Sequence, residues 1–460
     1  MTALELKDIT FAYEEGEEVL HHVNFHADHG EVTLLSGYSG TGKSTVLHIL
    51  SGIIPDTIRG TLTGDVLVDE EKYNGKRIGE FCRKIGLVLQ NADEQIIQTT
   101  VEDEIAFGCE NLNFDPKFIS RQIDKTCELM ELNKAWKPRK LSGGQKQRLL
   151  TACILAMDQH ILIMDEPLAN LDKEGAELVM NLARKLAHEQ DYAVLVVEHR
   201  LDVVLPYVDV QWTIDKGVIT KVDGKDTSQT EIIPDTCPPY TPGDTLFALN
   251  HVAFRTDKRD ILKDISFDVE TGERIVLLGE NGCGKTTLMR CIAKLNKLSG
   301  GSIDCPKWKK WFKHVGVVYQ NPNYQLFMPT VYQEVFFSCK SEEHTKEILE
   351  LFKLTDIAER HPQSLSEGQK RRVSIAAVAA EDPDILLLDE PTVGQDYEGL
   401  TDLVEILNNL HMQSNTTMIT ITHDSRCAEA LCDHVILIDG GVVAKEGGKE
   451  LVRDYFSLDF

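Results

Sequence analysis

The sequence has no apolar run long enough to cross a membrane: the longest, such as residues 193–197, cover only a few positions. A membrane-spanning helix needs about 20 apolar residues. The first residues, Met1–Asp8, contain neither a basic start nor a long apolar stretch, which argues against a secretory signal. We therefore expect any membrane role to pass through another chain.

The eleven cysteines include no Cys-x-x-Cys pair and no cluster with histidine at metal-ligand spacing. Their odd number and scattered positions predict reduced, mostly structural thiols, as in a cytosolic protein. The chain is also poor in positive charge, with 48 Lys and Arg against 74 Asp and Glu and a net charge of −26. Because nucleic-acid binders normally present a basic patch, this balance argues against nucleic acid as a partner.

An internal repeat dominates the 460 residues, whose length and 42% hydrophobic content allow two or three globular domains. Four features of the first half return in the second: residues 37–44 as 279–286, 141–145 as 365–369, 161–167 as 385–391, and His199 as His423. The last three pairs keep a constant spacing of 224 residues, whereas the first pair is 242 apart. The shorter second half has therefore lost residues only between its first two motifs.

The repeat predicts two domains, residues 1–222 and 246–460, joined by a linker over 223–245. This linker contains four prolines among Asp, Thr and Gly, which disfavour regular structure. In both halves short β-rich runs, such as 32–35 and 274–278, lead into glycine-rich loops and then helices. This alternation predicts an α/β fold with a largely parallel sheet covered by helices.

Each half contains a glycine-rich phosphate-binding loop between a strand and a helix. Its glycines let several backbone N–H groups converge on phosphate oxygens, while Lys43 and Lys285 reach the β- and γ-phosphates. The Ser44 and Thr286 hydroxyls are expected to ligate Mg²⁺. The candidate ATP-binding residues of the two loops are Gly37, Ser39, Gly40, Gly42, Lys43, Ser44 and Thr45, and Gly279, Asn281, Gly282, Gly284, Lys285, Thr286 and Thr287.

An Asp-Glu pair ends an apolar strand in each half. Asp165 and Asp389 are predicted to hold Mg²⁺, directly or through water. Glu166 and Glu390 are predicted to polarise the attacking water and so to be catalytic. Together with the loops, these pairs predict ATP hydrolysis at two sites.

The segment Leu-Ser-Gly-Gly-Gln-Lys-Gln-Arg at 141–148 lies just upstream of the first Asp-Glu strand. With this signature the chain resembles the ATP-binding cassette superfamily along nearly its whole length. The resemblance implies two tandem P-loop NTPase domains, each with an antiparallel β subdomain and a helical signature subdomain. It also implies that each signature helix points its N-terminus at the γ-phosphate held by the opposite half, where N–H groups stabilise an anion.

The resemblance assigns further residues to the two sites. It implies that Gln90 and Gln320 sense Mg²⁺ and water, that His199 and His423 contact the γ-phosphate, and that Tyr13 stacks on adenine. The D-loop aspartates would be Asp172 and Asp396. The signature residues that would contact ATP are Ser142, Gly143, Gly144 and Gln145 in the first half and Ser366, Glu367, Gly368 and Gln369 in the second.

Two composite sites follow from this resemblance, each pairing the loop of one half with the signature of the other. Two departures from the family pattern stand in the second half. Glu367 replaces the first signature glycine, and threonine falls where an aromatic residue such as Tyr13 is expected, in the segment 254–256. We expect both sites to hydrolyse ATP, with a silent site caused by Glu367 as the alternative.

The segments after the Q-loop glutamines, 90–97 with 100–108 and 320–327 with 329–335, look like those of the energy-coupling factor importers of vitamins and transition-metal ions. That resemblance implies a groove for the coupling helices of an integral membrane scaffold, together with a membrane substrate-binding subunit, and places the chain at the cytoplasmic face of the membrane. The residues expected to line the groove are Ile96, Ile97, Leu326 and Phe327, with the acids Asp93 and Glu94 beside them. Inward packing of the apolar residues is the alternative.

Other assignments remain open from the sequence. A twin-cassette ATPase of a sugar importer has the same motifs but a different membrane partner. A ribosome-acting translation factor would carry a long basic linker, whereas 223–245 is acidic. The transported substrate is not encoded in a subunit that contacts only ATP and the scaffold.

Overall fold

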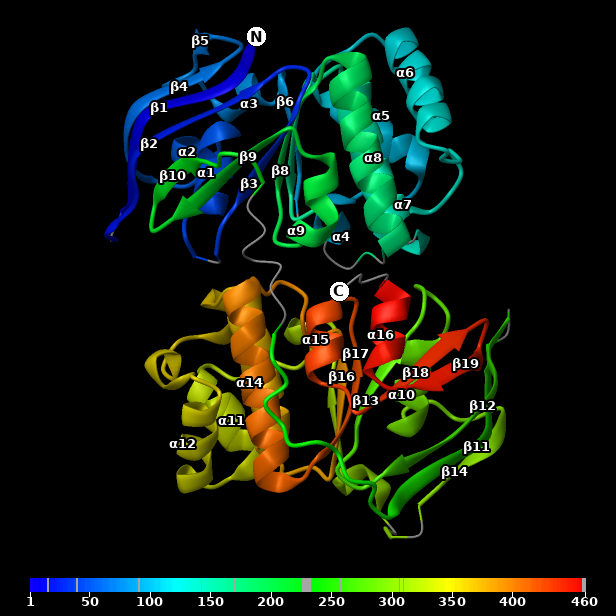
Figure 1. Cartoon of the computed structure of the whole chain (residues 1–460). Coiled ribbons are helices and arrows are strands. Elements are labelled where there is room, and N and C mark those ends of the chain that lie inside the picture. The colour runs from blue at the N-terminus through cyan, green and yellow to red at the C-terminus, as the bar shows by residue number, and fades with distance from the viewer. Residues whose placement is uncertain are drawn as a thin grey trace. The chain divides into compact units, whose positions relative to one another are not determined.

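The computed structural model describes residues 1–14, 16–38, 40–89, 92–141, 143–168, 171, 173–225, 233–256, 259–305, 307–308 and 310–456. The chain forms two compact units, Met1–Glu231 and Ile232–Phe460. Figure 1 shows both, coloured along the chain. Among the described residues, no helix combines the length and apolar character needed to cross a bilayer.

The core of the first unit is a six-stranded sheet in the order β10-β9-β3-β8-β7-β6. Its strands are β3 (Val32–Ser36), β6 (Ile85–Val88), β7 (Ile161–Asp165), β8 (Ala193–Val197), β9 (Val210–Asp215) and β10 (Val218–Lys221). All neighbours pair in parallel except β10, which runs antiparallel to β9. Continuous burial of β3 and β8 is typical of parallel strands covered on both faces.

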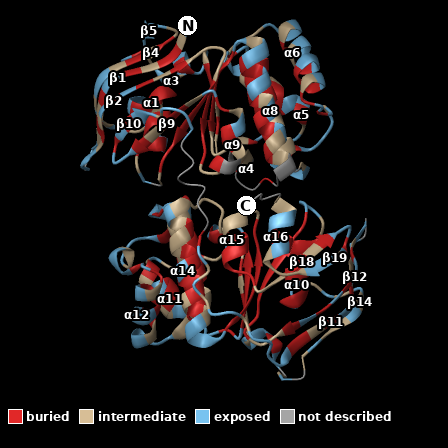
Figure 2. Ribbon diagram, viewed as in Figure 1, coloured by how far each residue is buried: buried red, intermediate tan, exposed pale blue. Residues whose placement is uncertain are grey.

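Alternate residues of these strands face two separate cores, as the two-residue period of a strand requires. Leu34 and Val196 pack with the helices on one face, whereas Leu35 and Val197 pack with the other layer. The helices of the unit are α1 (Lys43–Leu50), α2 (Ile53–Asp56), α3 (Ile78–Phe81), α4 (Ala92–Gln95), α5 (Val101–Asn111), α6 (Pro116–Leu129), α7 (Gly143–Ala156), α8 (Lys173–Gln190) and α9 (Leu201–Val204), with 3-10 turns η1 (Pro138–Lys140) and η2 (Leu205–Tyr207). Figure 2 shows the buried strands between helices whose outer faces are exposed.

A second, antiparallel sheet of the first unit has the order β2-β1-β4-β5. Its strands are β1 (Thr2–Tyr13), β2 (Glu18–Asp28), β4 (Gly60–Val68) and β5 (Glu71–Lys72). Buried residues of this sheet pack on α1 in the same core as Leu35. The sheet therefore supports the helix that follows the first phosphate-binding loop.

The second unit repeats this plan in one nine-stranded sheet, ordered β14-β11-β12-β19-β18-β13-β17-β16-β15. Its strands are β11 (Thr245–Arg255), β12 (Asp260–Glu270), β13 (Arg274–Leu278), β14 (Gly300–Asp304), β15 (Val315–Val318), β16 (Ile385–Asp389), β17 (Thr417–Ile421), β18 (His434–Asp439) and β19 (Val442–Gly447). A single pair, Asp264 with Val442, joins the antiparallel part to the core sheet. The sheets thus confirm the predicted α/β class with largely parallel core strands.

The helices of the second unit follow the same order as those of the first. They are α10 (Lys285–Ile292), α11 (Val331–Cys339), α12 (Glu342–Leu351), α13 (Glu367–Ala379), α14 (Tyr397–Ser414), α15 (Ser425–Ala430) and α16 (Lys449–Phe456), with 3-10 turns η4 (Trp311–Lys313), η5 (Pro322–Tyr324), η6 (Thr355–Ile357) and η7 (Pro362–Ser364). Helices α11 to α13 form the helical layer with the core around Phe352 and Val373.

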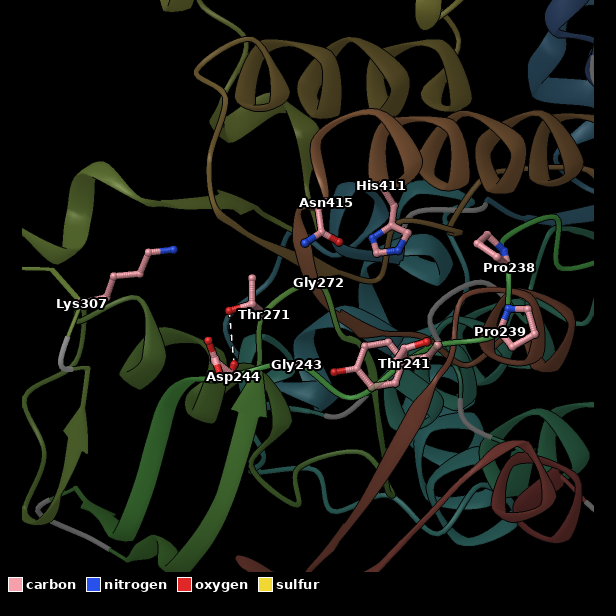
Figure 3. Close-up of a pocket in the computed structure, with 11 residues that line it drawn as sticks. Pro238, Pro239, Thr241, Gly243, Asp244, Thr271, Gly272, Lys307, His411 and Asn415 are labelled. Carbon is pink, nitrogen blue, oxygen red and sulfur yellow. Dashed lines mark hydrogen bonds between the residues drawn. The ribbon is translucent and has the colours of Figure 1, made fainter.

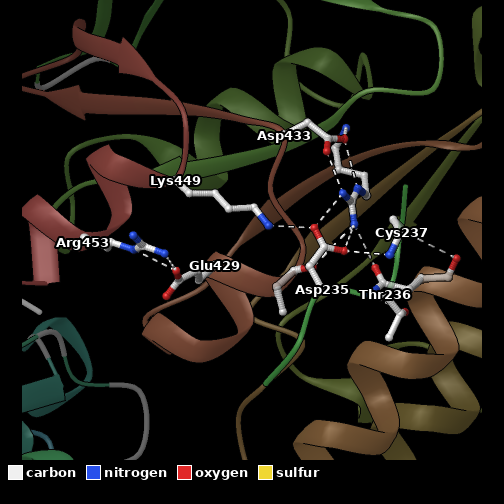
Figure 4. A network of polar contacts seen from close by, with 10 residues as sticks. Asp235, Thr236, Cys237, Glu429, Asp433, Lys449 and Arg453 are labelled. Atoms are coloured by element: carbon white, nitrogen blue, oxygen red, sulfur yellow. Dashed lines mark hydrogen bonds and ion pairs between the residues drawn. The ribbon is translucent and has the colours of Figure 1, made fainter. Parts of the chain in front are cut away.

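The predicted linker, 223–245, does not act as a free connection along its whole length, because its part from residue 233 onward packs on the second unit. Asp235 accepts hydrogen bonds from Arg274 at 2.9 and 3.0 Å and from Lys449 at 2.8 Å. Arg274, only 2% exposed, also pairs with Asp433. Figure 4 shows Asp235 and Cys237 of the linker beside Lys449 and Asp433.

The next stretch of this segment lines a surface cavity of 520 Å³ in the second unit. Figure 3 shows Pro238, Pro239 and Thr241 on one side, with His411 and Asn415 of the neighbouring helix end. Gly272, at φ 76°, lies so close to Asn415 that a β-carbon there would be 2.3 Å from its side-chain oxygen. The whole segment 233–244 is thus part of the second unit's surface.

Candidate active sites

The phosphate-binding loops close on the first turn of α1 and α10. The last loop glycine caps each helix in the left-handed conformation, at φ 110° for Gly42 and 116° for Gly284. A β-carbon at Gly284 would lie 2.7 Å from the Leu262 side chain. Both the conformation and the space therefore require glycine at the end of the loop.

The loop lysines lie over the carbonyls of their own loops. The Lys43 ammonium donates to the Gly37 carbonyl at 2.8 Å and to the Tyr38 carbonyl at 2.6 Å. Lys285 makes the corresponding bonds to the Gly279 and Glu280 carbonyls. Each ammonium is thus held at the loop whose N–H groups would bind a phosphate.

The aspartates predicted to bind metal end β7 and β16. Burial, with the neighbouring Glu166 carboxylate adding to it, raises the pKa of Asp165 to about 7. The pKa of Asp389 is raised to about 6 in the same way by burial and Glu390. The Thr286 hydroxyl donates to the Asp389 carboxylate at 3.1 Å. A hydroxyl and a carboxylate together are the hard oxygen donors that suit Mg²⁺, so this pair fits the predicted metal, which would neutralise phosphate charge.

The catalytic glutamates are held by strained backbone. Glu166 and Glu390 have positive φ values of 45° and 52°, a conformation costly for a residue with a β-carbon. Their N–H groups donate to the Val197 and Ile421 carbonyls at 2.8 and 2.9 Å, which fixes that turn. Such strain aims the side chain away from the strand end, where a water molecule could be polarised.

Each glutamate contacts the predicted switch histidine of its own half. His199 Nε2 lies 2.9 Å from the Glu166 carboxylate, and His423 Nε2 lies 3.3 Å from that of Glu390. The structure therefore brings together residues that are 33 positions apart in both halves. A carboxylate and an imidazole at this distance can orient water and share a proton in its attack on a phosphate.

The second signature begins helix α13 with a capping box. The Ser366 hydroxyl accepts from the Gln369 N–H at 3.3 Å, and the Gln369 side chain accepts from the Ser366 N–H at 3.2 Å. The Glu367 carboxylate accepts from Lys370 on the next turn at 2.8 Å. This pairing offsets the negative charge that Glu367 places at the anion-facing helix start.

The Tyr13 ring ends β1 and remains 37% exposed. Its hydroxyl shares a 2.9 Å hydrogen bond with Thr45 Oγ1, next to the loop, and its face meets the edge of Phe11. Ser39, Gln90, Ser142 and Asp172 lie outside the described residues, so their assignments remain predictions. Gln320 is exposed beyond the end of β15.

Comparison with protein families decides what this arrangement belongs to. The family described as ABC transporter matches residues 20–169 and 262–393, which include both loops and both Asp-Glu strands. The chain belongs to the ABC transporter family.

Relatives of this ABC ATPase match it over nearly its full length. A Bacillus subtilis protein, provisionally named the HMP/thiamine import ATP-binding protein YkoD, is 32% identical over 96% of this chain and 91% of its own. A Methanosarcina mazei protein, provisionally named an ABC transporter ATP-binding protein, is 30% identical over 96% of this chain and 88% of its own. Tandem cassettes are therefore shared with these relatives.

Solved structures with the same fold include the complex of archaeal ribosomal stalk protein aP1 with ribosome recycling factor aABCE1. That match has a TM-score of 0.67 over 98% of this chain and 92% of the other. A structure named RNase-L Inhibitor gives a TM-score of 0.66 with the same two coverages. At 21% sequence identity in both cases, these likenesses show the twin-cassette fold.

Two matched clamps of the ABC ATPase were missed in the sequence. The Gln95 amide accepts from the Leu89 N–H at 2.7 Å and donates to the Leu87 carbonyl at 2.9 Å. In the second half the Gln325 amide makes the same two bonds, to Tyr319 and Val317 at 2.8 Å. The recurrence of glutamine five residues after each Q-loop glutamine was the available signal.

Buried Glu104 and Glu334 form the second pair of clamps. Glu104 accepts from the N–H groups of Ile97 and Gln98, and Glu334 accepts from those of Phe327 and Met328. Burial raises the pKa of Glu104, although these hydrogen bonds oppose the shift. A carboxylate spent on two N–H groups holds the preceding loop in one conformation.

Another acid missed in the sequence, Glu198, supports the first site alone. It is buried and accepts from the N–H groups of Leu168, His199 and Arg200 at 3.1, 2.8 and 3.2 Å. In the second half Thr422 stands at this position and shares a 3.0 Å hydrogen bond with Thr392. The segment carrying the switch histidine is therefore positioned differently in the two halves.

Cys283 inside the second loop gives a direct test of ligand placement. Burial raises the pKa of its thiol, so little thiolate is present at neutral pH and alkylation should accelerate only as pH rises through the raised value. We expect Mg²⁺ and ATP to protect Cys283 from iodoacetamide, measured by peptide mass spectrometry. Exposed Cys82 serves as the control and should label equally with and without ATP. Undiminished labelling of Cys283 in saturating ATP would show that the loop does not hold the nucleotide.

Proposed function

We propose that this ABC ATPase drives a membrane importer of the energy-coupling factor type, which takes up a vitamin or a transition-metal ion. The observation that carries the proposal is an apolar side chain presented to solvent at the same place in both halves. Ile97 is 54% exposed and Phe327 is 75% exposed, and each follows directly on a Q-loop segment. Burying such side chains against another protein would be favourable.

The neighbouring apolar residues behave differently from the prediction. Ile96 and Leu326 are only 6% and 5% exposed and pack into the helical cores. They support the loop from inside, so only Ile97 and Phe327 of the four predicted groove residues are available to a partner. The side chains of Asp93 and Glu94 lie outside the described part of the chain.

Further exposed aromatic residues enlarge this surface in the second unit. Phe312, Phe337 and Tyr324 are each more than three-fifths exposed. Phe312 lines a cavity of 620 Å³ together with Ser338 and Cys339 at the end of α11. We call Phe312, Tyr324, Phe327 and Phe337 the aromatic surface. A hollow beside exposed rings suits a short amphipathic helix of the membrane scaffold.

Charge supports a basic partner helix. The chain carries a net charge of −26, which favours the approach of a positively charged segment. In the proposed mechanism, ATP binds between the loop of one half and the signature of the other, and closure moves the docked helices. Hydrolysis by Glu166 and Glu390 then reopens the halves and resets the membrane subunits.

The name of the Bacillus subtilis relative, which refers to HMP/thiamine import, also supports an importer. The names of the structural neighbours refer to the ribosome, but those likenesses stand at 21% identity and concern the fold. A ribosome-acting ATPase is therefore the rival outcome of the test below.

The test is affinity capture of the tagged chain from gently solubilised native membranes, followed by mass spectrometry. We expect an integral scaffold protein and a small membrane substrate-binding subunit to be recovered. Ribosomal proteins without an integral membrane partner would overturn the importer assignment and leave the ATPase intact.

Surface variants sharpen this test. Phe327→Ser and Ile97→Ser should each lower recovery of the scaffold several-fold, because buried apolar contact area is lost at the interface. Leu295→Ser and Leu178→Ser, both 56% exposed in the free chain, are matched controls away from the Q-loop segments and should leave recovery unchanged. Equal losses in all four variants would show that the loss is not specific to this surface.

A further inference from the structure

The two halves differ where the base of a bound nucleotide would lie. In the first half Tyr13 is preorganised as a platform: its hydroxyl is tied to Thr45 and its face rests on the edge of Phe11, with ring centroids 4.9 Å apart. A ring held by two contacts loses little freedom when a base stacks on it. This platform stands directly beside the start of α1, where the phosphates end.

Strand register identifies the equivalent position in the second half. Phe11 pairs with Leu20 on the neighbouring strand, and Phe254 pairs with Leu262 in the same way. Counting two residues onward from each phenylalanine leads from Tyr13 to Thr256. The alignment is therefore geometric and does not depend on sequence similarity in this variable segment.

The loops confirm that the two strand pairs are placed alike. A β-carbon on Gly42 would lie 2.9 Å from the Leu20 side chain, and one on Gly284 would lie 2.7 Å from that of Leu262. In each half the same leucine thus touches the last glycine of the loop. Thr256 consequently occupies the place of Tyr13 relative to the phosphates.

Thr256 is used within its own turn. Its hydroxyl donates to the Arg259 carbonyl at 3.2 Å and accepts from the Arg259 N–H at 3.3 Å. The sequence from Arg255 to Asp260 contains no aromatic residue. Thr287, the counterpart of Thr45, is partly exposed, whereas Thr45 is buried beneath the tyrosine. The second half therefore has no ring to cover the base.

We propose that the second site is indifferent to the base: it holds a nucleoside triphosphate by its phosphates and accepts purines and pyrimidines alike. The first site, by contrast, gains part of its affinity from stacking on Tyr13. This inference rests on the ATP binding at both loops that the proposed function requires, but it does not depend on the membrane partner. It assigns the base selectivity of the whole chain to the first half.

The expected effect follows from stacking energetics. One base stacked on an aromatic side chain contributes on the order of tenfold in affinity. The phosphate contacts of glycine loop, lysine and hydroxyl are present in both halves, so the base contribution can be isolated by comparing ATP with inorganic tripolyphosphate.

Two single-site proteins separate the halves: Lys285→Ala leaves the first loop intact and Lys43→Ala leaves the second. Calorimetric titration with ATP, GTP, CTP and inorganic tripolyphosphate in Mg²⁺ would be run on each. We expect the second-site protein to bind the three nucleotides within roughly threefold of one another, and the first-site protein to favour ATP over CTP by on the order of tenfold.

Substitutions at the two equivalent positions complete the test. Tyr13→Ala in the first-site protein should weaken ATP about tenfold without changing tripolyphosphate, and Thr256→Tyr in the second-site protein should tighten ATP selectively. Thr256→Ser keeps the turn hydroxyl and should change neither ligand. Equal preference for ATP over CTP in both single-site proteins would overturn the inference. If the second-site protein binds neither ATP nor tripolyphosphate, the ATP binding that the proposed function requires fails there and the inference falls with it.

Discussion

Replacing both Glu166 and Glu390 with glutamine is expected to lower ATP turnover by about 10²–10⁴-fold, the usual contribution of a positioned general base. Glutamine keeps the size of the side chain but cannot accept a proton from the attacking water. ATP binding should persist, because the loop lysines and glycines are untouched. The measurement is steady-state phosphate release beside equilibrium ATP binding on the same preparation.

The single variants distinguish two active sites from one. Because His199 and His423 contact their glutamates in the same way, we expect each single variant to lower the rate. Glu398→Gln and Glu189→Gln, exposed acids in α14 and α8, are the controls and should turn over ATP normally. An unchanged rate in Glu166→Gln would mean that the first site, which pairs with the Glu367 signature, is silent.

Arg274→Met is expected to destabilise the second unit by about 3–5 kcal/mol, the cost of breaking a buried ion pair on one side. The substitution leaves Asp235 and Asp433 without the guanidinium that binds both. The segment 233–244 would lose its main attachment at the same time. Urea unfolding would measure the change through Trp308 and Trp311, in a Trp136→Phe, Trp212→Phe background that silences the first unit.

An exposed arginine of the same unit provides the matched control. Arg255 pairs with Asp260, but its side chain is 70% exposed, so Arg255→Met should change the free energy of unfolding by only about 0–1 kcal/mol. Adding Asp433→Asn to Arg274→Met should recover part of the loss, because it removes one of the stranded charges. Equal unfolding midpoints for the two arginine variants would show that the buried network does not hold the linker.

The α/β class, the repeat and the residues of the hydrolytic motifs could be predicted because each depends on a few neighbouring residues. A glycine-rich loop between a strand and a helix specifies its own geometry, so Lys43 and Lys285 were found from spacing alone. The contact of Glu390 with His423 was implied only by the family resemblance, since 33 residues separate them.

Other features depend on tertiary packing and left weak traces in the sequence. Prolines in 223–245 indicated irregular chain but not that Asp235 would meet a buried arginine from β13. Two adjacent apolar residues in a loop have no periodicity, so nothing local told Ile96, which is buried, from Ile97, which is exposed. The positive φ of Glu166 and Glu390 likewise follows from the strand beyond the motif.

The central claim is that one chain carries two complete nucleotide sites, and the stoichiometry of ATP binding tests it most directly. Equilibrium binding of Mg²⁺ and ATP to the Glu166→Gln, Glu390→Gln double variant, in which bound ATP is not consumed, should saturate at two nucleotides per chain. Saturation at one nucleotide, or no binding at all, would contradict the account.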